Sequence, residues 1–183
     1  MKIYFVRHAE VIEKYQGKYN GHIDIPLSQK GKKDAALLGK KLNKIVFDKV
    51  YCSDLLRARE TLHAMQIDAP IVYTTALREK FWGESEGKSF EELQALGKKY
   101  TTFLDWIKQL GGESIEAFHQ RIWRFFQEEI LTQNAMNILV VTHAGVIKSF
   151  IALEKKITLE ESFSYSLEYN SFVVYDTDKG FVV

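Results

Sequence analysis

Short apolar runs recur along the chain, and longer segments with helical spacing separate them. The runs are rich in Val, Ile, Tyr and Phe, which predicts β-strands at residues 3–6, 50–52, 71–73, 138–142 and 172–175. Segments 28–45, 54–65 and 114–131 repeat apolar residues at intervals of three or four, and a further helix is expected from Gly145. Ser114 is placed to cap the third of these helices. The alternation predicts an α/β fold: a three-layer sandwich with a mostly parallel central sheet and helices on both faces.

The pattern shows no domain boundary. The chain has two prolines, no Ser/Gly-rich linker and no internal repeat, and 183 residues suffice for one sizeable core. We therefore expect one domain over residues 1–183. Residues 85–110 combine helical spacing with polar and aromatic side chains, which predicts a helical excursion that covers the functional site.

Composition and charge narrow the possible partners. The formal net charge is +1, so nothing draws the whole chain to nucleic acid. The single cysteine, Cys52, excludes an internal disulfide and a cysteine-rich metal site. The first apolar run is too short for a signal peptide or a membrane span. We expect a cytoplasmic protein that binds neither nucleic acid nor membranes, and the choice between monomer and homodimer stays open.

The same pattern occurs twice along the chain. Both "IYFVRHAEV" and "ILVVTHAGV" are an apolar strand, one polar residue and then His-Ala, so His8 and His143 follow two strands at equivalent places. Ligands of open α/β sheets bind beyond the carboxyl ends of the strands. If these two strands are parallel neighbours, both imidazoles face one crevice.

Two other predicted strand ends carry charged side chains. "VYCSDLLRARET" offers Arg57 and Arg59, and "TTALREKFWGESEG" offers Arg78 and Glu79. Arginine matches phosphate oxygens with a planar fork, a neutral imidazole can attack phosphorus, and a carboxylic acid can protonate a leaving alkoxide. This set of residue types indicates a phosphate site. The chain has no G-x-G-x-x-G, P-loop or H-E-x-x-H pattern, so dinucleotide, P-loop and zinc-protease chemistries lack support.

Five ordered motifs together resemble one known family. They are "VRHAE", "NGHIDIPLSQKGKKDA", "CSDLLRARET", "LREKFWGESEGKSFEEL" and "VVTHAGVIK", and they run in order from Lys2 to about Lys148. The chain is similar to the histidine phosphatase superfamily, which has the phosphoglycerate mutase-like fold.

The resemblance implies a role for each matched residue. His8 would be the nucleophile that becomes phosphohistidine, and Glu79 would be the proton donor to the leaving group. The phosphate pocket would be completed by Arg7, Arg57 and His143. The resemblance implies neither a metal nor a cofactor.

Weaker matches and departures surround these residues. Asn20 and Gly21 match positions that line the substrate mouth, where His22 is a further candidate. Lys14 stands where many members carry a phosphate-binding asparagine, and it is a further candidate. Members usually have glycine at the positions of Ala9 and Ala144. Alanine costs little there if the backbone has negative φ and would be strained at positive φ.

Several functions stay open at this point. The favoured one is a metal-independent phosphomonoester hydrolase that acts on a small phosphorylated metabolite. The short chain and "YNGHIDIPLSQKG" look like the alpha-ribazole-5'-phosphate phosphatases of cobalamin biosynthesis. The mutases that the chain resembles are longer and carry extra basic residues after the "LRE" motif, where this chain has no arginine but keeps Lys88 and Lys98. Alternatives are therefore a phosphoglycerate mutase, a non-catalytic phospho-ligand binder and a protein phosphatase.

Overall fold

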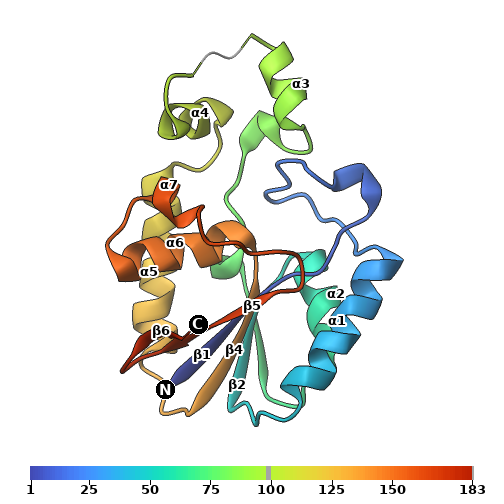
Figure 1. Cartoon of the computed structure of the whole chain (residues 1–183), viewed down its shortest axis with the longest axis vertical. Coiled ribbons are helices and arrows are strands. Elements are labelled where there is room, and N and C mark those ends of the chain that lie inside the picture. The colour runs from blue at the N-terminus through green and yellow to red at the C-terminus, as the bar shows by residue number, and fades with distance from the viewer. Residues whose placement is uncertain (98–99, 183) are drawn as a thin grey trace.

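The centre of the molecule is a twisted six-stranded sheet in the order β3-β2-β4-β1-β5-β6 (Figure 1). The computed structural model describes residues 1–97 and 100–182, so Lys98 lies outside the described residues. The strands are β1 (Lys2–Arg7), β2 (Lys49–Ser53), β3 (Ile71–Thr74), β4 (Asn137–Thr142), β5 (Phe172–Asp176) and β6 (Gly180–Val182).

The sheet is mixed, with a parallel majority. β1 and β2 both pair with β4 in parallel, and β3 pairs with β2 in parallel. β5 runs antiparallel to β1, and β6 runs antiparallel to β5. The five predicted strands and the mostly parallel sheet are confirmed, whereas β6 was not predicted. It is three residues long, too short for the pattern of its side chains to identify it.

Two helical layers cover the sheet because its strands alternate apolar side chains between both faces. In β1, Ile3 and Phe5 enter one core cluster, and Tyr4 and Val6 enter the other. The first cluster packs against α5 (Ile115–Phe125) and α6 (Ala144–Lys155), and the second against α1 (Gln29–Leu42) and α2 (Leu56–Met65). Figure 1 shows these two helical layers on opposite sides of the strands. The three-layer prediction is confirmed.

The helix predicted over 114–131 forms with one irregularity. The Ser114 hydroxyl caps α5 by accepting from the N–H of Ala117 at 3.0 Å, as predicted. After Phe125 the helix widens into a π-helical turn, Phe126–Ile130. Phe126 and Ile130 are fully buried, so this turn keeps two apolar side chains in the core.

The predicted excursion contains two helices that stand beyond the sheet. α3 (Phe90–Ala95) and α4 (Phe103–Leu110) lie above the carboxyl ends of β1 and β4, and α4 is the one beside the short helix α7 (Leu159–Ser162) (Figure 1). The excursion has its own small core of Leu93, Trp106, Ile107 and Leu110. It is therefore a separately packed cover on that end of the sheet.

Within the described part of the chain, no helix combines the length and the apolar character that a bilayer crossing requires.

Candidate active site

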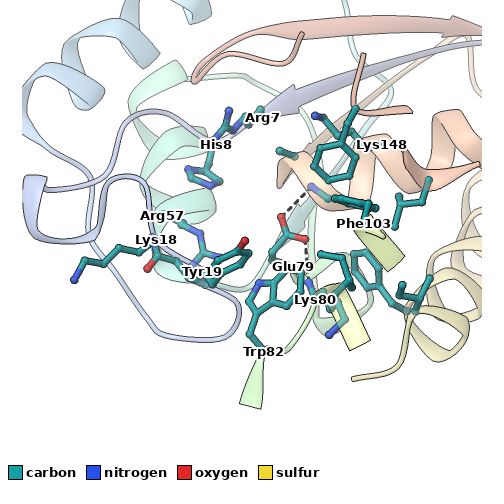
Figure 2. Close-up of a pocket in the computed structure, with 18 of the residues that line it drawn as sticks. Arg7, His8, Lys18, Tyr19, Arg57, Glu79, Lys80, Trp82, Phe103 and Lys148 are labelled. Carbon is teal, nitrogen blue, oxygen red and sulfur yellow. Dashed lines mark hydrogen bonds between the residues drawn. The ribbon is translucent and has the colours of Figure 1, made fainter. Parts of the chain in front are cut away.

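A pocket of about 240 Å³ opens at the carboxyl ends of β1 and β4, below the excursion. Figure 2 shows it between the ends of these strands, the first turns of α2 and α6, and the excursion. Of the residues predicted from the sequence, those that line the pocket are Arg7, His8, Asn20, Arg57 and Glu79. His143 and Gly21 are buried behind this lining, His22 is half-buried, and Lys14 is exposed outside it.

His8 presents a free ring nitrogen to the pocket. Its Nδ1 lies 2.8 Å from the carbonyl oxygen of Ala9, and a carbonyl oxygen can only accept, so we assign the proton to Nδ1. In the neutral ring, Nε2 then carries a lone pair. Burial is the main cause that lowers the pKa of His8 well below its ordinary value, and the positive charges of Arg57 and Arg7 lower it further. His8 is therefore neutral and nucleophilic at neutral pH.

His143 is a second neutral histidine, packed 5.2 Å from His8 between ring centroids. Its Nδ1 accepts from Nε of Arg57 at 3.2 Å, so its Nε2 carries the proton and donates to the Ser53 hydroxyl at 2.8 Å. Burial first, then the charge of Arg57, lowers the pKa of His143 well below its ordinary value. Both ring nitrogens of His143 are thus engaged by protein groups.

These two histidines predict that the protein loses stability in mild acid. The unfolded chain binds a proton at each one below a pKa of 6.5, whereas the folded chain does not until a lower pH. The free energy of unfolding should therefore fall by roughly 1.4 kcal/mol per pH unit for each histidine below that pH. Urea unfolding between pH 7.5 and 5 measures this. A flat profile over that range would contradict it, and exposed His63→Ala should leave the slope unchanged.

Arg57 is held in a cage of backbone carbonyls. Nη1 donates to Ile23 at 2.9 Å, Nη2 donates to Asn20 and Gly21 at 2.8 Å each, and Nε donates to His143. Four of its five N–H donors are therefore occupied. Burial lowers the pKa of Arg57 to about 10, so it remains charged at neutral pH. Arg57 thus supplies positive charge and fixes the 20–23 segment, with one N–H left for a ligand.

Gly21 permits a close crossing of two chain segments. A Cβ atom at this position would lie 2.4 Å from the carbonyl oxygen of Lys80 and 2.3 Å from Oε1 of Glu86. Only glycine fits without moving the Lys80 backbone. Gly21 therefore positions the neighbouring Asn20, which does line the pocket.

Arg7 keeps a donor free. Its Nη1 donates to the carbonyl oxygen of Leu167, and its guanidinium carbon lies 4.1 Å from the ring centroid of Tyr169. Its Nε is buried and has no hydrogen-bond partner among the described residues. A buried donor without a partner is costly, so a ligand oxygen in the pocket would satisfy it.

Glu79 is clamped at the start of α6. Its Oε1 accepts from the N–H of Lys80, and its Oε2 accepts from the N–H of Gly145, each at 2.9 Å (Figure 2). His22 supports the same loop from behind, because its Nε2 donates to the Glu79 carbonyl oxygen at 2.9 Å. The carboxyl group therefore has a defined position in the pocket, across from His8.

The glycine that this site needs is Gly145. A Cβ atom there would lie 2.0 Å from Oε1 of Glu79. Ala9 and Ala144 are not among the residues with positive φ, so alanine at those two positions is unstrained. The departures from the family pattern therefore leave the backbone intact.

We expect Gly145→Ala to damage activity more than stability. The added methyl displaces only the end of the Glu79 side chain, yet a shift of about 1 Å in a catalytic group costs up to roughly 100-fold in kcat. Steady-state kinetics and thermal unfolding of the variant measure the two effects. In a Glu79→Gln background the same substitution should cost less than about threefold. A full additional loss there would show that Gly145 does not act through Glu79.

The remaining sequence candidate, Lys14, lies away from the pocket. Its Nζ lies 5.3 Å from the Tyr15 ring centroid, and the side chain is exposed. The stretch from Gly83 to Gly87 also fits the G-x-S-x-G pattern of hydrolase nucleophile elbows. Ser85, however, lies buried in a 3₁₀ turn, and its hydroxyl donates to the carbonyl oxygen of Leu110 at 2.7 Å. It does not act as a nucleophile from that position.

Sequence reasoning missed most of the pocket wall. Trp82 and Phe103 belong to the aromatic stretch that was expected to cover the site. The residues not identified include three lysines, Lys18, Lys80 and Lys148, and the apolar or aromatic residues Ile107, Phe118, Phe163 and Tyr169. Among the residues that were not identified, Lys148 had a local signal, since it follows Ala144 by one helical turn. Among the described residues, no group of three or more His, Cys, Asp or Glu side chains could hold a metal ion.

Comparison with known proteins assigns this geometry to a family. The model of the histidine phosphatase superfamily (branch 1) matches residues 3–183. The adenosylcobalamin/alpha-ribazole phosphatase of Escherichia coli (strain K12) is 30% identical over 187 residues, 99% of this chain and 92% of that protein. The 2,3-bisphosphoglycerate-dependent phosphoglycerate mutase 2 of Gloeobacter violaceus is 30% identical over 178 residues, 90% of this chain and 80% of that protein. The crystal structure of the alpha-ribazole phosphatase from Shigella flexneri superposes with a TM-score of 0.84 at 28% identity, covering 100% of this chain and 95% of that one.

Proposed function

Because the chain belongs to the histidine phosphatase superfamily, we propose that it hydrolyses phosphomonoesters of small metabolites through a phosphohistidine at His8. The observation that carries this proposal is the neutral His8 ring, with its proton on Nδ1 and its Nε2 free in the pocket. Free Nε2 is the atom that nucleophilic attack requires.

The first step transfers the phosphoryl group to the enzyme. The free Nε–H of Arg7 and the charge of Arg57 attract the phosphate oxygens. The Nε2 lone pair of His8 forms a bond to phosphorus while the bond from phosphorus to the ester oxygen breaks. Glu79, as the protonated acid, donates its proton to the departing alkoxide. The products of this step are the alcohol and phosphohistidine.

The second step returns the enzyme to its starting state. A water molecule attacks phosphorus, and the Glu79 carboxylate takes its proton. The bond from phosphorus to Nε2 breaks, and His8 regains its lone pair as inorganic phosphate leaves. His143 would join phosphate binding only by releasing the Ser53 hydroxyl, because both of its ring nitrogens are engaged.

Alpha-ribazole 5'-phosphate is a candidate substrate. The relatives from Escherichia coli and Shigella flexneri are alpha-ribazole phosphatases, and the pocket wall beyond the phosphate end is aromatic. The aromatic base of such a leaving group would bury apolar surface against Trp82, Phe103 and Phe163.

The test is a phosphatase screen with EDTA present and no added metal. The panel contains p-nitrophenyl phosphate, alpha-ribazole 5'-phosphate, 3-phosphoglycerate and nucleotides. Phosphate release that resists EDTA supports the proposal, and the substrate with the highest kcat/KM identifies the class. Conversion of 3-phosphoglycerate to its 2-isomer without phosphate release would indicate a mutase. Ligand binding without any turnover would indicate a phospho-ligand binder.

A further inference from the structure

Lys148 is a cation in the pocket wall that the phosphatase mechanism does not use. It lies on α6, one helical turn beyond Ala144, and helical side chains lean toward the N-terminus of their helix. Its Nζ lies 3.9 Å from the Phe163 ring centroid. Figure 2 shows Lys148 beside Phe103, across the pocket from His8.

The other lysines of the pocket already have oxygen partners. Lys80 donates to the carbonyl oxygens of Phe81 at 3.2 Å and Gly111 at 2.9 Å. Lys18 lies 3.6 Å from a carboxylate oxygen of Glu92. Lys148, in contrast, has no hydrogen bond or ion pair with an oxygen atom within the described part of the chain. Its three N–H donors are therefore available to a ligand.

The surroundings of Lys148 make an unused ammonium group costly. Burial lowers its pKa first and the positive charge of Arg7 lowers it further, while only the charge of Glu79 opposes them. The cation–π contact with the Phe163 ring offsets part of this cost. An apolar side chain would fill the same space without this cost, so a bound anion explains a lysine here better than packing does.

The position of Lys148 relates it to the leaving group of the substrate. In phosphoryl transfer the attacking and departing atoms lie roughly in line with phosphorus, so the leaving group points away from His8. Lys148 lies across the pocket from His8, near enough to both Arg7 and Glu79 for their charges to act on it, and Glu79 protonates the leaving oxygen. A second anion on the leaving group would therefore meet the ammonium in an apolar wall, where charge pairs are stronger than in water.

We propose that Lys148 is a specificity-determining residue that binds a carboxylate on the leaving group, so that the site prefers phosphate esters of hydroxy acids. This inference rests on the proposed function, because it assigns the leaving group to the pocket wall across from His8. It also separates the candidate substrates, since alpha-ribazole 5'-phosphate has no such carboxylate and would not use Lys148.

Two substrates that differ only in this group provide the test. 3-Phosphoglycerate carries a carboxylate where glycerol 3-phosphate carries a hydroxymethyl group. Lys148→Met should lower the ratio of kcat/KM for the first to that for the second by tenfold or more, and Lys148→Arg should restore most of it. Lys155→Met is the matched control. Lys155 lies on the same helix with its Nζ 5.3 Å from the Tyr165 ring centroid, but it is outside the pocket lining.

Binding measurements separate this proposal from the catalytic one. Calorimetry with the His8→Ala chain needs no turnover. In that background, Lys148→Met should weaken the binding of 3-phosphoglycerate tenfold relative to the binding of glycerol 3-phosphate. Equal weakening of both ligands, together with weaker binding of inorganic phosphate, would overturn the proposal, because Lys148 would then bind the phosphoryl group. An unchanged ratio would also overturn it. If the wild-type chain hydrolyses none of the substrates but still binds 3-phosphoglycerate better than glycerol 3-phosphate through Lys148, only the phosphatase function is refuted.

Discussion

His8→Ala is expected to abolish phosphatase activity, with a loss in kcat of about 10⁴-fold or more. Alanine has no lone pair to attack phosphorus, and its methyl group leaves space that only an unactivated water can fill. Phosphate should still bind, since Arg7 and Arg57 remain in place. The measurement is steady-state phosphate release, together with mass spectrometry of rapidly quenched protein. Wild-type protein should carry a covalent phosphoryl group on the peptide that contains His8, and the variant should not.

A matched histidine controls for nonspecific effects. His63 lies exposed on α2, outside the pocket, so His63→Ala should keep wild-type activity and phosphoenzyme. Removal of the buried His8 ring also leaves a cavity that can lower stability, so thermal unfolding of both variants should be compared. If His8→Ala remains folded and retains more than about one hundredth of the wild-type kcat, His8 is not the nucleophile.

Glu79→Gln is expected to show the second largest effect, and its size should depend on the leaving group. A general acid contributes about 10²–10⁴-fold when the departing alkoxide is a strong base. An alkyl phosphate should therefore lose that factor in kcat/KM. The kcat/KM for p-nitrophenyl phosphate should fall by less than about tenfold, because its phenolate leaves without needing a proton. The ratio of the two losses is the measurement.

The amide also disturbs the local hydrogen bonds, and the control accounts for this. Glu79 accepts from the N–H groups of both Lys80 and Gly145, whereas glutamine can accept from only one without turning its NH₂ toward the other. Glu84→Gln, on an exposed carboxylate of the same loop region, should leave kinetics unchanged. Equal losses on both substrates would assign Glu79 to positioning rather than to proton donation.

The sequence alone determined the framework of this protein. The strands could be predicted because their apolar side chains serve two buried faces, as in Ile3–Val6 of β1. The two His-Ala repeats indicated one crevice because parallel strands bring their carboxyl ends to one edge, and β1 and β4 are such neighbours. These features depend on local periodicity and on a general rule of sheet geometry.

Only the tertiary structure decided how the site residues are used. The proton of His8 is placed by the Ala9 carbonyl oxygen, and the donors of Arg57 are occupied by carbonyl groups more than thirty residues away in sequence. Gly145 is required by Glu79, 66 residues earlier in the chain. Such contacts arise where separate segments converge, and no local pattern records them.

The pocket wall shows the same division most clearly. Lys148 and Phe163 have ordinary helical surroundings in the sequence, and their meeting beside Phe103 depends on how α4, α6 and α7 pack over one end of the sheet. The ring centroids of Phe103 and Phe163 lie 4.8 Å apart although sixty residues separate them. Residue types and spacing therefore predicted the residues that act on the phosphate group, because these residues follow directly after the strands. The surroundings of the leaving group were decided by long-range packing, because each wall residue comes from a different segment.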